Sequence, residues 1–466
     1  MTKLFFMIKL IFVIGIVFCF ISGTRAQTKP SFTTSLESVI SSGDQLPFWF
    51  TANQNCIYTT IEKSQQLLSV NGNYAVKKLF NSPLDFELGT HLITSYSGQF
   101  QFQANELFSK FYLFGWKLEA GWFKEPLYFN NISSTNGNID RSNNARPYPK
   151  IRFGTNEFIP FLFWKDWFSF KAEYDEGWLN DNRYVMGTRL HHKSLYGRVK
   201  FVNQSAFTLG LNHYVMWGGI SPNPTYGQLP DEWQDYWVYI TGSVGNERFP
   251  VTDQFNVAGN QFGSYHLQYD FNIRSSTLSL FINHPFEDHS GMELKNIRDN
   301  LYGIYADFGK NQIIEAIIYE FMYTKHQGGS QHIQGSTGLD NYYNHGVYLS
   351  GYSYEGMMMV SPLFAPVNDV DGVALGIANN RIIMHHLGWK GSLFPSVSWD
   401  GKLTYSQNFG TYSGAFDPVK NQMSVLLQFN YHSSGFPLDF SLSLAADHGQ
   451  LYENRAGILF KISKSF

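Results

Sequence analysis

Two short motifs in this chain have the spacing that serine hydrolysis at a membrane requires. His192 and Ser194 are two residues apart, as are His432 and Ser434, so in a strand each pair points to one face. An outer-membrane phospholipase would need such a pair. Two pairs are no more than chance gives in a chain with 14 histidines and many serines, and neither G-x-S-x-G nor H-E-x-x-H occurs. These motifs therefore give no signal for catalysis.

Metal binding has an equally weak basis in the sequence. Asp369 and Asp371, followed by Gly372, resemble the start of a calcium loop, but the rest of the ligand spacing is missing. Adjacent histidine pairs, such as His191 and His192, point to opposite faces of a strand and cannot chelate together. We expect no metal and no cofactor.

The elements that position these residues are strands. Residues 267–274 alternate between apolar and polar side chains, and the same period of two recurs at 195–201 and 424–432. The polar half includes Arg198 and Asp270, which would be costly in lipid but suit a hydrated lumen. The pattern indicates strands with one face toward lipid and one toward water.

The last strand has the same two faces. Ile458, Phe460 and Phe466 point one way, whereas Lys461 and Ser463 point the other way. A chain that stops on an aromatic residue of such a strand resembles the closing strand of bacterial outer-membrane barrels. The alternative is an ordinary C-terminal strand of a soluble β protein.

The N-terminus predicts export. Lys3 and Lys9 precede the apolar run Leu10–Ile21, and small residues lead to a cleavage point after Ala26. Residues 1–26 are therefore expected to be a secretory signal peptide, because the run is short for a membrane-spanning helix. No later stretch approaches the roughly 20 apolar residues that a helical span needs.

Composition favours a membrane barrel and excludes several partners. The chain is 17% aromatic with a mean hydropathy of −0.23, which suits a barrel with aromatic girdles around a polar interior. A large secreted β-sandwich could have the same composition. With 34 basic and 37 acidic residues and no basic stripe, nucleic acid is not an expected partner. Cys56 is the single cysteine left after processing, so no intrachain disulfide is expected.

We predict an all-β fold: a transmembrane antiparallel up-and-down β-barrel with a short, partly helical N-terminal periplasmic segment. Residues 27–64 lack alternation and are assigned to that periplasmic extension, and residues 65–466 to the outer-membrane barrel. At roughly 20–25 residues for each strand and its connections, the barrel has roughly 16–20 strands. Loop-forming segments rich in Gly, Asn, Ser and Pro predict extracellular loops at 130–144, 217–236, 328–346 and 360–372.

A series of aromatic and polar strings runs from Pro47 to Tyr354. The strings include Pro47-Phe-Trp-Phe50, Asn143-Asn-Ala-Arg-Pro147, His192-Lys-Ser-Leu-Tyr-Gly-Arg198, Trp217-Gly-Gly219, Pro285-Phe-Glu-Asp-His-Ser-Gly291, Asp299-Asn-Leu-Tyr-Gly303 and Asp340-Asn-Tyr-Tyr-Asn344. Their order and number resemble the capsule-assembly Wzi family, in the form found in Bacteroidetes. The resemblance implies a barrel of about eighteen strands in the Gram-negative outer membrane. It also implies a non-enzymatic, lectin-like role in holding capsular or extracellular polysaccharide at the cell surface.

Sugar binding needs flat aromatic faces and planar hydrogen-bonding groups. Arg146 and Lys150 are candidates because a charged polymer would use cations, although both could instead pair with acids of the barrel wall. Trp217 precedes two glycines that could present its ring to a sugar, or else it is an interfacial tryptophan.

Two further clusters are candidates for polysaccharide binding. Glu287 and Asp288 form a dense polar group, and Tyr342, Tyr343 and Asn344 combine rings with an amide. The favoured alternative for both clusters is that they brace the barrel and its loops through hydrogen bonds.

The expected protein is a monomer that contacts polysaccharide and outer-membrane lipid, with the export machinery as a further partner. One alternative is a saccharide or lipid transport pore, with a lumen lined by Arg198, Lys200, Asp270 and Arg274. The second alternative is an outer-membrane phospholipase that uses Ser194.

Overall fold

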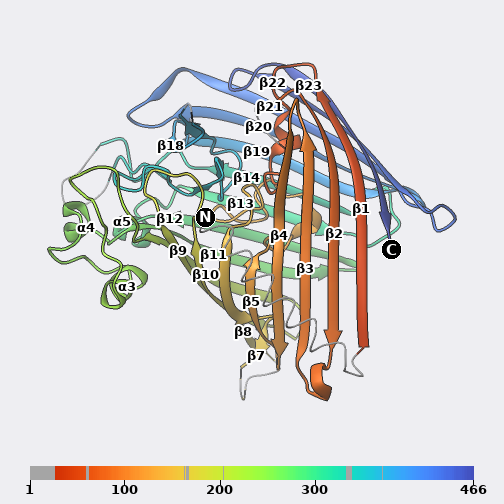
Figure 1. The fold of residues 1–466 in the computed structure, drawn as a ribbon, viewed down its shortest axis with the longest axis horizontal. Coiled ribbons are helices and arrows are strands. Elements are labelled where there is room, and N and C mark those ends of the chain that lie inside the picture. Colours follow the sequence, from red (N-terminus) through yellow and green to blue (C-terminus); the bar gives the residue numbers. More distant parts are fainter. Residues whose placement is uncertain are drawn as a thin grey trace.

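The structure is a computed structural model that describes residues 27–58, 62–161, 163, 167–202, 204–331, 338–369 and 371–466. The predicted signal peptide lies outside the described residues. Antiparallel strands follow one another around a closed wall, and Figure 1 shows the first strand, in red, beside the last, in dark blue.

Within the described residues, the wall is one sheet of 19 strands. These strands are β1 Gln27–Ser41, β2 Ser64–Lys77, β3 Asp85–Tyr96, β4 Phe100–Leu113, β5 Trp116–Trp122, β6 Pro149–Thr155, β7 Ile159–Pro160, β8 Phe168–Trp178, β9 Arg189–Lys200, β10 Ala206–Trp217, β11 Asn260–Ile273, β12 Ser276–Phe286, β13 Asn300–Asp307, β14 Ala316–Tyr323, β19 Ile382–Phe394, β20 Val397–Gly410, β21 Ala415–Tyr431, β22 Asp439–Gly449 and β23 Arg455–Ser465. Because β6 and β7 pair end to end with β8, the barrel has 18 strand positions, as predicted.

Smaller elements lie in the connections. They are the helices α2 Phe48–Thr51, α3 Trp233–Ile240, α4 Val251–Phe255 and α5 His289–Met292, the 3-10 turns η1 Leu79–Asn81 and η2 Phe129–Asn131, and the short strands β15 Ser353–Tyr354, β16 Met357–Met358, β17 Pro366–Asn368 and β18 Ala374–Ile377. No helix in the described part of the chain has both the length and the apolar character needed to cross a membrane.

The alternation expected from the sequence sets the two faces of the wall. On β9, His192, Ser194 and Arg198 face the lumen, and they pair with Asp175, Glu173 and Ser169 of β8. Leu195 lies between them and is exposed on the outer face. On the last strand, Ile458 and Phe460 are exposed on that same outer face, as predicted. A belt of exposed apolar side chains around a polar interior is the arrangement that a membrane barrel requires.

The long connections all leave the same end of the barrel. Because strands alternate in direction, connections 42–63, 123–148, 218–259 and 324–381 emerge at one end, whereas turns such as 114–115, 274–275 and 395–396 lie at the other. We call these the long-loop end and the short-turn end. Outer-membrane barrels place short turns in the periplasm and long loops outside the cell.

Described residues of two long connections fold back into the lumen instead of staying outside. Glu320 of β14, which is fully buried, accepts hydrogen bonds from the Ser133 and Ser134 hydroxyls, each at 2.6 Å. The Ser142 hydroxyl donates to the Val360 carbonyl at 2.6 Å, which joins connection 123–148 to connection 324–381. We call these two connections the plug.

The N-terminal assignment was wrong. Residues 27–41, expected in a periplasmic extension, form β1, which pairs with β2 and with β23. The short helix of this region, α2, lies at the long-loop end, and Phe48 N donates to Asp447 of β22. The alternation in β1 is hidden because Ser and Thr occur on both of its faces. The exposed face also carries Phe32, Leu36 and Ile40, and the buried face carries Glu37 and Val39.

Candidate functional site

The long-loop end contains a cavity of about 230 Å³ between the first connection, the plug and the turn before β23. We call it the outer hollow. Its lining includes Phe48, Tyr452 and Arg455 with the side-chain amides of Gln45 and Asn368. The rings of Phe48 and Tyr452 are stacked, with centroids 5.9 Å apart and planes 17° apart. Aromatic faces beside planar hydrogen-bonding groups are the chemistry that recognises a sugar ring.

The outer hollow is close to neutral. Arg455 is the single charged residue among the described residues of its lining, and Arg455 Nε donates to Asp447 Oδ2 at 2.8 Å. Arg455 Nη1 also donates to Gln45 Oε1 at 3.1 Å, so the guanidinium holds the amide in place. A hollow of this kind suits neutral sugar units better than strongly charged ones.

A second cavity at the same end, of about 170 Å³, is acidic. We call it the acidic hollow. It is lined by Asp253, Glu287, Asp288 and Asp340, and no lysine or arginine is among the described residues that line it. Burial, together with the carboxylates of Asp288 and Asp299, raises the pKa of Asp340 to about 7. The acidic hollow offers carboxyl groups and amides to sugar hydroxyls and no described cation to an anion, so it suits neutral or amino sugars.

The structure brings three of the predicted binding residues together here. Glu287, Asp288 and Asn344 all line the acidic hollow. Asn344 also has a bracing role, because its Oδ1 accepts from Ile377 N at 2.7 Å. The Asp288 carboxylate accepts from the backbone and hydroxyl of Ser290, each at 2.8 Å. These side chains therefore both shape the loops and face the hollow.

The two predicted tyrosines do not line either hollow. Tyr342 is buried, and its hydroxyl donates to Asp299 Oδ2 at 2.7 Å. Tyr343 is fully buried against Phe262 and Phe364, with ring centroids 4.7 Å away in both cases. Both rings belong to the core of the plug, so the bracing interpretation fits them.

Arg146 and Lys150 also contact the barrel wall and the plug rather than either hollow. Lys150 lies on β6 inside the barrel, 2% exposed, with its ammonium group 2.5 Å from Glu125 Oε1. Arg146 Nη2 donates to the Ala104 carbonyl at 2.7 Å, and Nη1 lies 3.5 Å from Glu355. The cavity that both residues line has a volume of about 40 Å³, which is too small for a sugar ring.

Trp217 lies on the outer side of the wall, under a small helical cover. Its ring is 4% exposed and packs against Tyr236 and Tyr239 of α3, and Nε1 donates to Glu176 Oε1 at 2.8 Å. The helices α3 and α4 stand at the side of the barrel, at the left of Figure 1. Trp217 is therefore a packing residue that fixes α3 to the wall.

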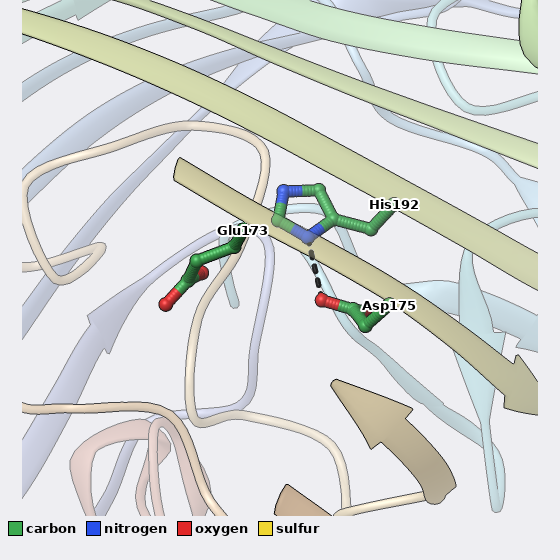
Figure 2. Close-up of side chains that lie close together, drawn as sticks. All are labelled: Glu173, Asp175 and His192. Atoms are coloured by element: carbon green, nitrogen blue, oxygen red, sulfur yellow. Dashed lines mark hydrogen bonds and ion pairs between the residues drawn. The ribbon is translucent and has the colours of Figure 1, made fainter. Parts of the chain in front are cut away.

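One lumen cluster has the residue types of a metal site. Ligand atoms of Glu173, Asp175 and His192 lie within 4.8 Å of one another, and Figure 2 shows His192 Nδ1 hydrogen-bonded to Asp175. However, Arg152 Nε lies 2.9 Å from Asp175, and Lys117 Nζ lies 3.2 Å from Glu173. Because these cations already neutralise the carboxylates, the cluster is better explained as part of an ion-pair network.

The His192–Ser194 pair is placed unfavourably for lipid hydrolysis. Both residues are on the lumen face of β9, away from the acyl chains outside. His192 Nδ1 is engaged by Asp175, and Nε2 has no hydrogen-bond partner among the described residues. A serine nucleophile needs a hydrogen bond to its base, which this pair lacks.

The sequence did not point to the outer hollow. Tyr452 and Arg455 flank the tight connection between two strongly alternating strands, and Gln45 comes from the segment assigned to a periplasmic extension. The one signal was the string that contains Phe48, which contributed to the family resemblance but did not indicate a role for Phe48 in binding.

Known proteins share this fold. The chain is similar to Escherichia coli Wzi, described as an outer-membrane protein involved in group 1 capsule assembly and a carbohydrate-binding β-barrel. The two are 15% identical with a TM-score of 0.57, over 92% of this chain and 83% of that chain. OccK2 of Pseudomonas aeruginosa is 9% identical with a TM-score of 0.48, over 94% of this chain and 98% of its own. No curated protein sequence matches the chain.

The family assignment comes from the sequence match. The sequence model of the family described as capsule assembly protein Wzi matches residues 24–377, which is more than half of the chain. The match therefore includes β1, both plug connections up to β18 and the residues that line the acidic hollow. The chain belongs to the Wzi family of capsule assembly proteins.

Proposed function

We propose that this protein is an outer-membrane barrel that binds capsular or extracellular polysaccharide and anchors or organises it at the cell surface. The family and the fold support the proposal, and E. coli Wzi is described as carbohydrate-binding. The observation that carries it is the pair of hollows at the long-loop end, one with stacked aromatic rings and one acidic.

The two hollows suit retention of a polymer better than capture of a small molecule. Each is the size of a short piece of glycan, and each offers a few hydrogen-bonding groups. When several weak contacts hold one chain, release requires all of them to open together, so retention exceeds the affinity of any one contact. A repeating polysaccharide supplies the repeated contacts.

The proposal includes how the protein reaches its place and what surrounds it. A cleaved signal peptide exports the chain, outer-membrane lipid surrounds the apolar belt, and the long-loop end faces out of the cell. The protein acts as a monomer without catalysis, of the Bacteroidetes type, and receives polymer from the export machinery. The plug disfavours the transport-pore alternative because it occupies the lumen.

A test compares cell-bound and shed polymer in the parent strain, in a strain lacking the gene, and in strains with single variants. Deletion should leave polymer synthesis unchanged while polymer moves into the medium. Tyr452→Ala should reproduce part of the loss because it removes a ring of the outer hollow. Tyr431→Ala is the matched control, since this tyrosine is near the short-turn end of β21. Equal cell-bound polymer in all strains would contradict the proposal.

A further inference from the structure

The lumen contains a cavity of about 200 Å³ on the opposite side of the plug from the two hollows. We call it the inner cavity. Plug residues, among them Phe129 and Asp140, cover it from the long-loop side. Its walls come from β8 to β11 and include Arg198 and Thr208, each two residues from the strand end that faces the short-turn end.

Two buried acceptors of the inner cavity lack hydrogen-bond partners. Asp140 and Asn212 are each 3% exposed, and neither Asp140 Oδ1 nor Asn212 Oδ1 has a partner among the described residues. The other ends of both side chains are fixed, because Asp140 Oδ2 accepts from Ser264 and Asn212 Nδ2 donates to the Tyr196 hydroxyl at 2.6 Å. A buried polar atom without a partner is costly, so two at one cavity suggest a ligand that brings hydroxyl donors.

The inner cavity also has aromatic surfaces of the kind that sugars stack on. Phe129 is held by Phe281, with ring centroids 4.8 Å apart and planes 16° apart, and Tyr196 is held by its bond from Asn212. Both rings line the cavity from different sides, one from the plug and one from β9. Fixed rings lose little entropy when a ligand stacks against them.

One cation of the inner cavity is unpaired. Lys171 of β8 makes no ion pair with any described residue, and its nearest recorded polar contact is the Tyr128 hydroxyl at 3.4 Å. Arg198, by contrast, lies 4.0 Å from Asp270 and over the Phe158 ring, and Arg141 pairs with Glu173. A free ammonium group in a partly buried cavity favours an anionic group on the ligand.

We infer that the inner cavity is a second carbohydrate site, reached from the short-turn end, that takes a single sugar unit bearing a carboxylate. Lys171 pairs with the carboxylate, Asp140 and Asn212 accept hydrogen bonds from ring hydroxyls, and Phe129 and Tyr196 contact the ring. The site differs from the outer and acidic hollows in position and in charge preference. It stands independently of the proposed surface function.

The test uses the full-length barrel in detergent, with D-glucuronate as the acidic probe and D-glucose as the neutral probe. Binding is followed by saturation-transfer NMR and titration calorimetry. We expect glucuronate to bind more tightly than glucose, and Lys171→Met to weaken glucuronate about tenfold while leaving glucose unchanged. Lys171→Arg should restore most of the preference because it keeps the charge.

Two control variants separate this site from the rest of the molecule. Lys390→Met removes another lumen lysine, on β19, that does not line the inner cavity, and should leave both probes unchanged. Tyr452→Ala alters the outer hollow and should also leave glucuronate binding unchanged. We expect a Kd of about 1 mM for glucuronate. The inference is overturned if no binding of glucuronate is detected at concentrations several times higher than that Kd, if glucose binds equally well, or if Lys171→Met does not change glucuronate binding.

Discussion

Glu125 joins the plug to the barrel wall through buried ion pairs. It begins the plug connection after β5, and its carboxylate lies 2.5 Å from Lys150, 2.9 Å from Arg152 and 3.2 Å from Arg141. All four side chains are largely buried. Burial alone would raise the pKa of Glu125, but the three cations outweigh it and hold the pKa well below the usual range.

Glu125→Gln keeps the shape of the side chain and removes its charge. Glu173 and Asp175 then remain as the carboxylates that face Arg141, Lys150 and Arg152. Breaking a buried ion pair by removing one partner costs about 3–5 kcal/mol, because the remaining charge is left desolvated. We expect the free energy of unfolding to fall by about that amount.

The measurement is urea unfolding of the barrel in lipid vesicles, with linear extrapolation to zero denaturant. The matched control is Glu293→Gln, because Glu293 pairs with Lys295 at 2.9 Å with its side chain 63% exposed. Exposed pairs contribute about 0–1 kcal/mol, so this variant should unfold like the parent. A Glu125→Gln protein within about 0.5 kcal/mol of the parent would refute the view that this network holds the plug.

Two further outcomes follow from the plug and from the acidic hollow. In planar bilayers the intact protein should give no steady current, whereas replacing residues 130–144 by a short Gly-Ser linker should open a conducting path; steady current from the intact chain would contradict the plugged lumen. Because the pKa of Asp340 is raised to about 7 in the folded state, its stabilising contribution is complete below its unfolded pKa and is lost as pH rises through about 7. Hydrogen exchange in connection 324–381, corrected for intrinsic rates, should therefore accelerate as pH rises from about 4 to about 7, and Asp340→Asn should weaken that dependence; an unchanged dependence in the variant would exclude Asp340 as a source.

The wall was predictable because each strand repeats the same two-faced pattern. Lipid favours apolar residues at most outward positions of β11 and β23, and the lumen tolerates charge at the inward positions, so the sequence of each strand has a period of two. β1 escaped detection because Ser and Thr side chains occur on both of its faces. Periodicity alone does not separate such a strand from an irregular segment.

The interior was not predictable in the same way. Connection 123–148 has the Asn-, Ser- and Gly-rich composition of an exposed loop, yet its polar side chains bond to wall residues such as Glu320. Composition shows that a segment is polar, but it does not show whether water or the barrel provides the hydrogen-bond partners of its polar groups. For the same reason the sequence left both a binding role and a bracing role open for Tyr342 and Tyr343, since a tyrosine can face a ligand or fill a core.

The seam between β1 and β23 makes the two ends of the chain interdependent. Nine registered pairs, from Thr33–Ser465 to Ser41–Gly457, join strands more than 400 residues apart, and Phe466 N donates to Phe32 O at 2.8 Å. A nascent sheet that lacks its final strand has two ragged edges of unpaired amides and carbonyls in a bilayer that offers them no water. Closure of the barrel therefore requires β23, and the backbone hydrogen bonds between Phe32 and Phe466 extend the seam one residue beyond the registered pairs.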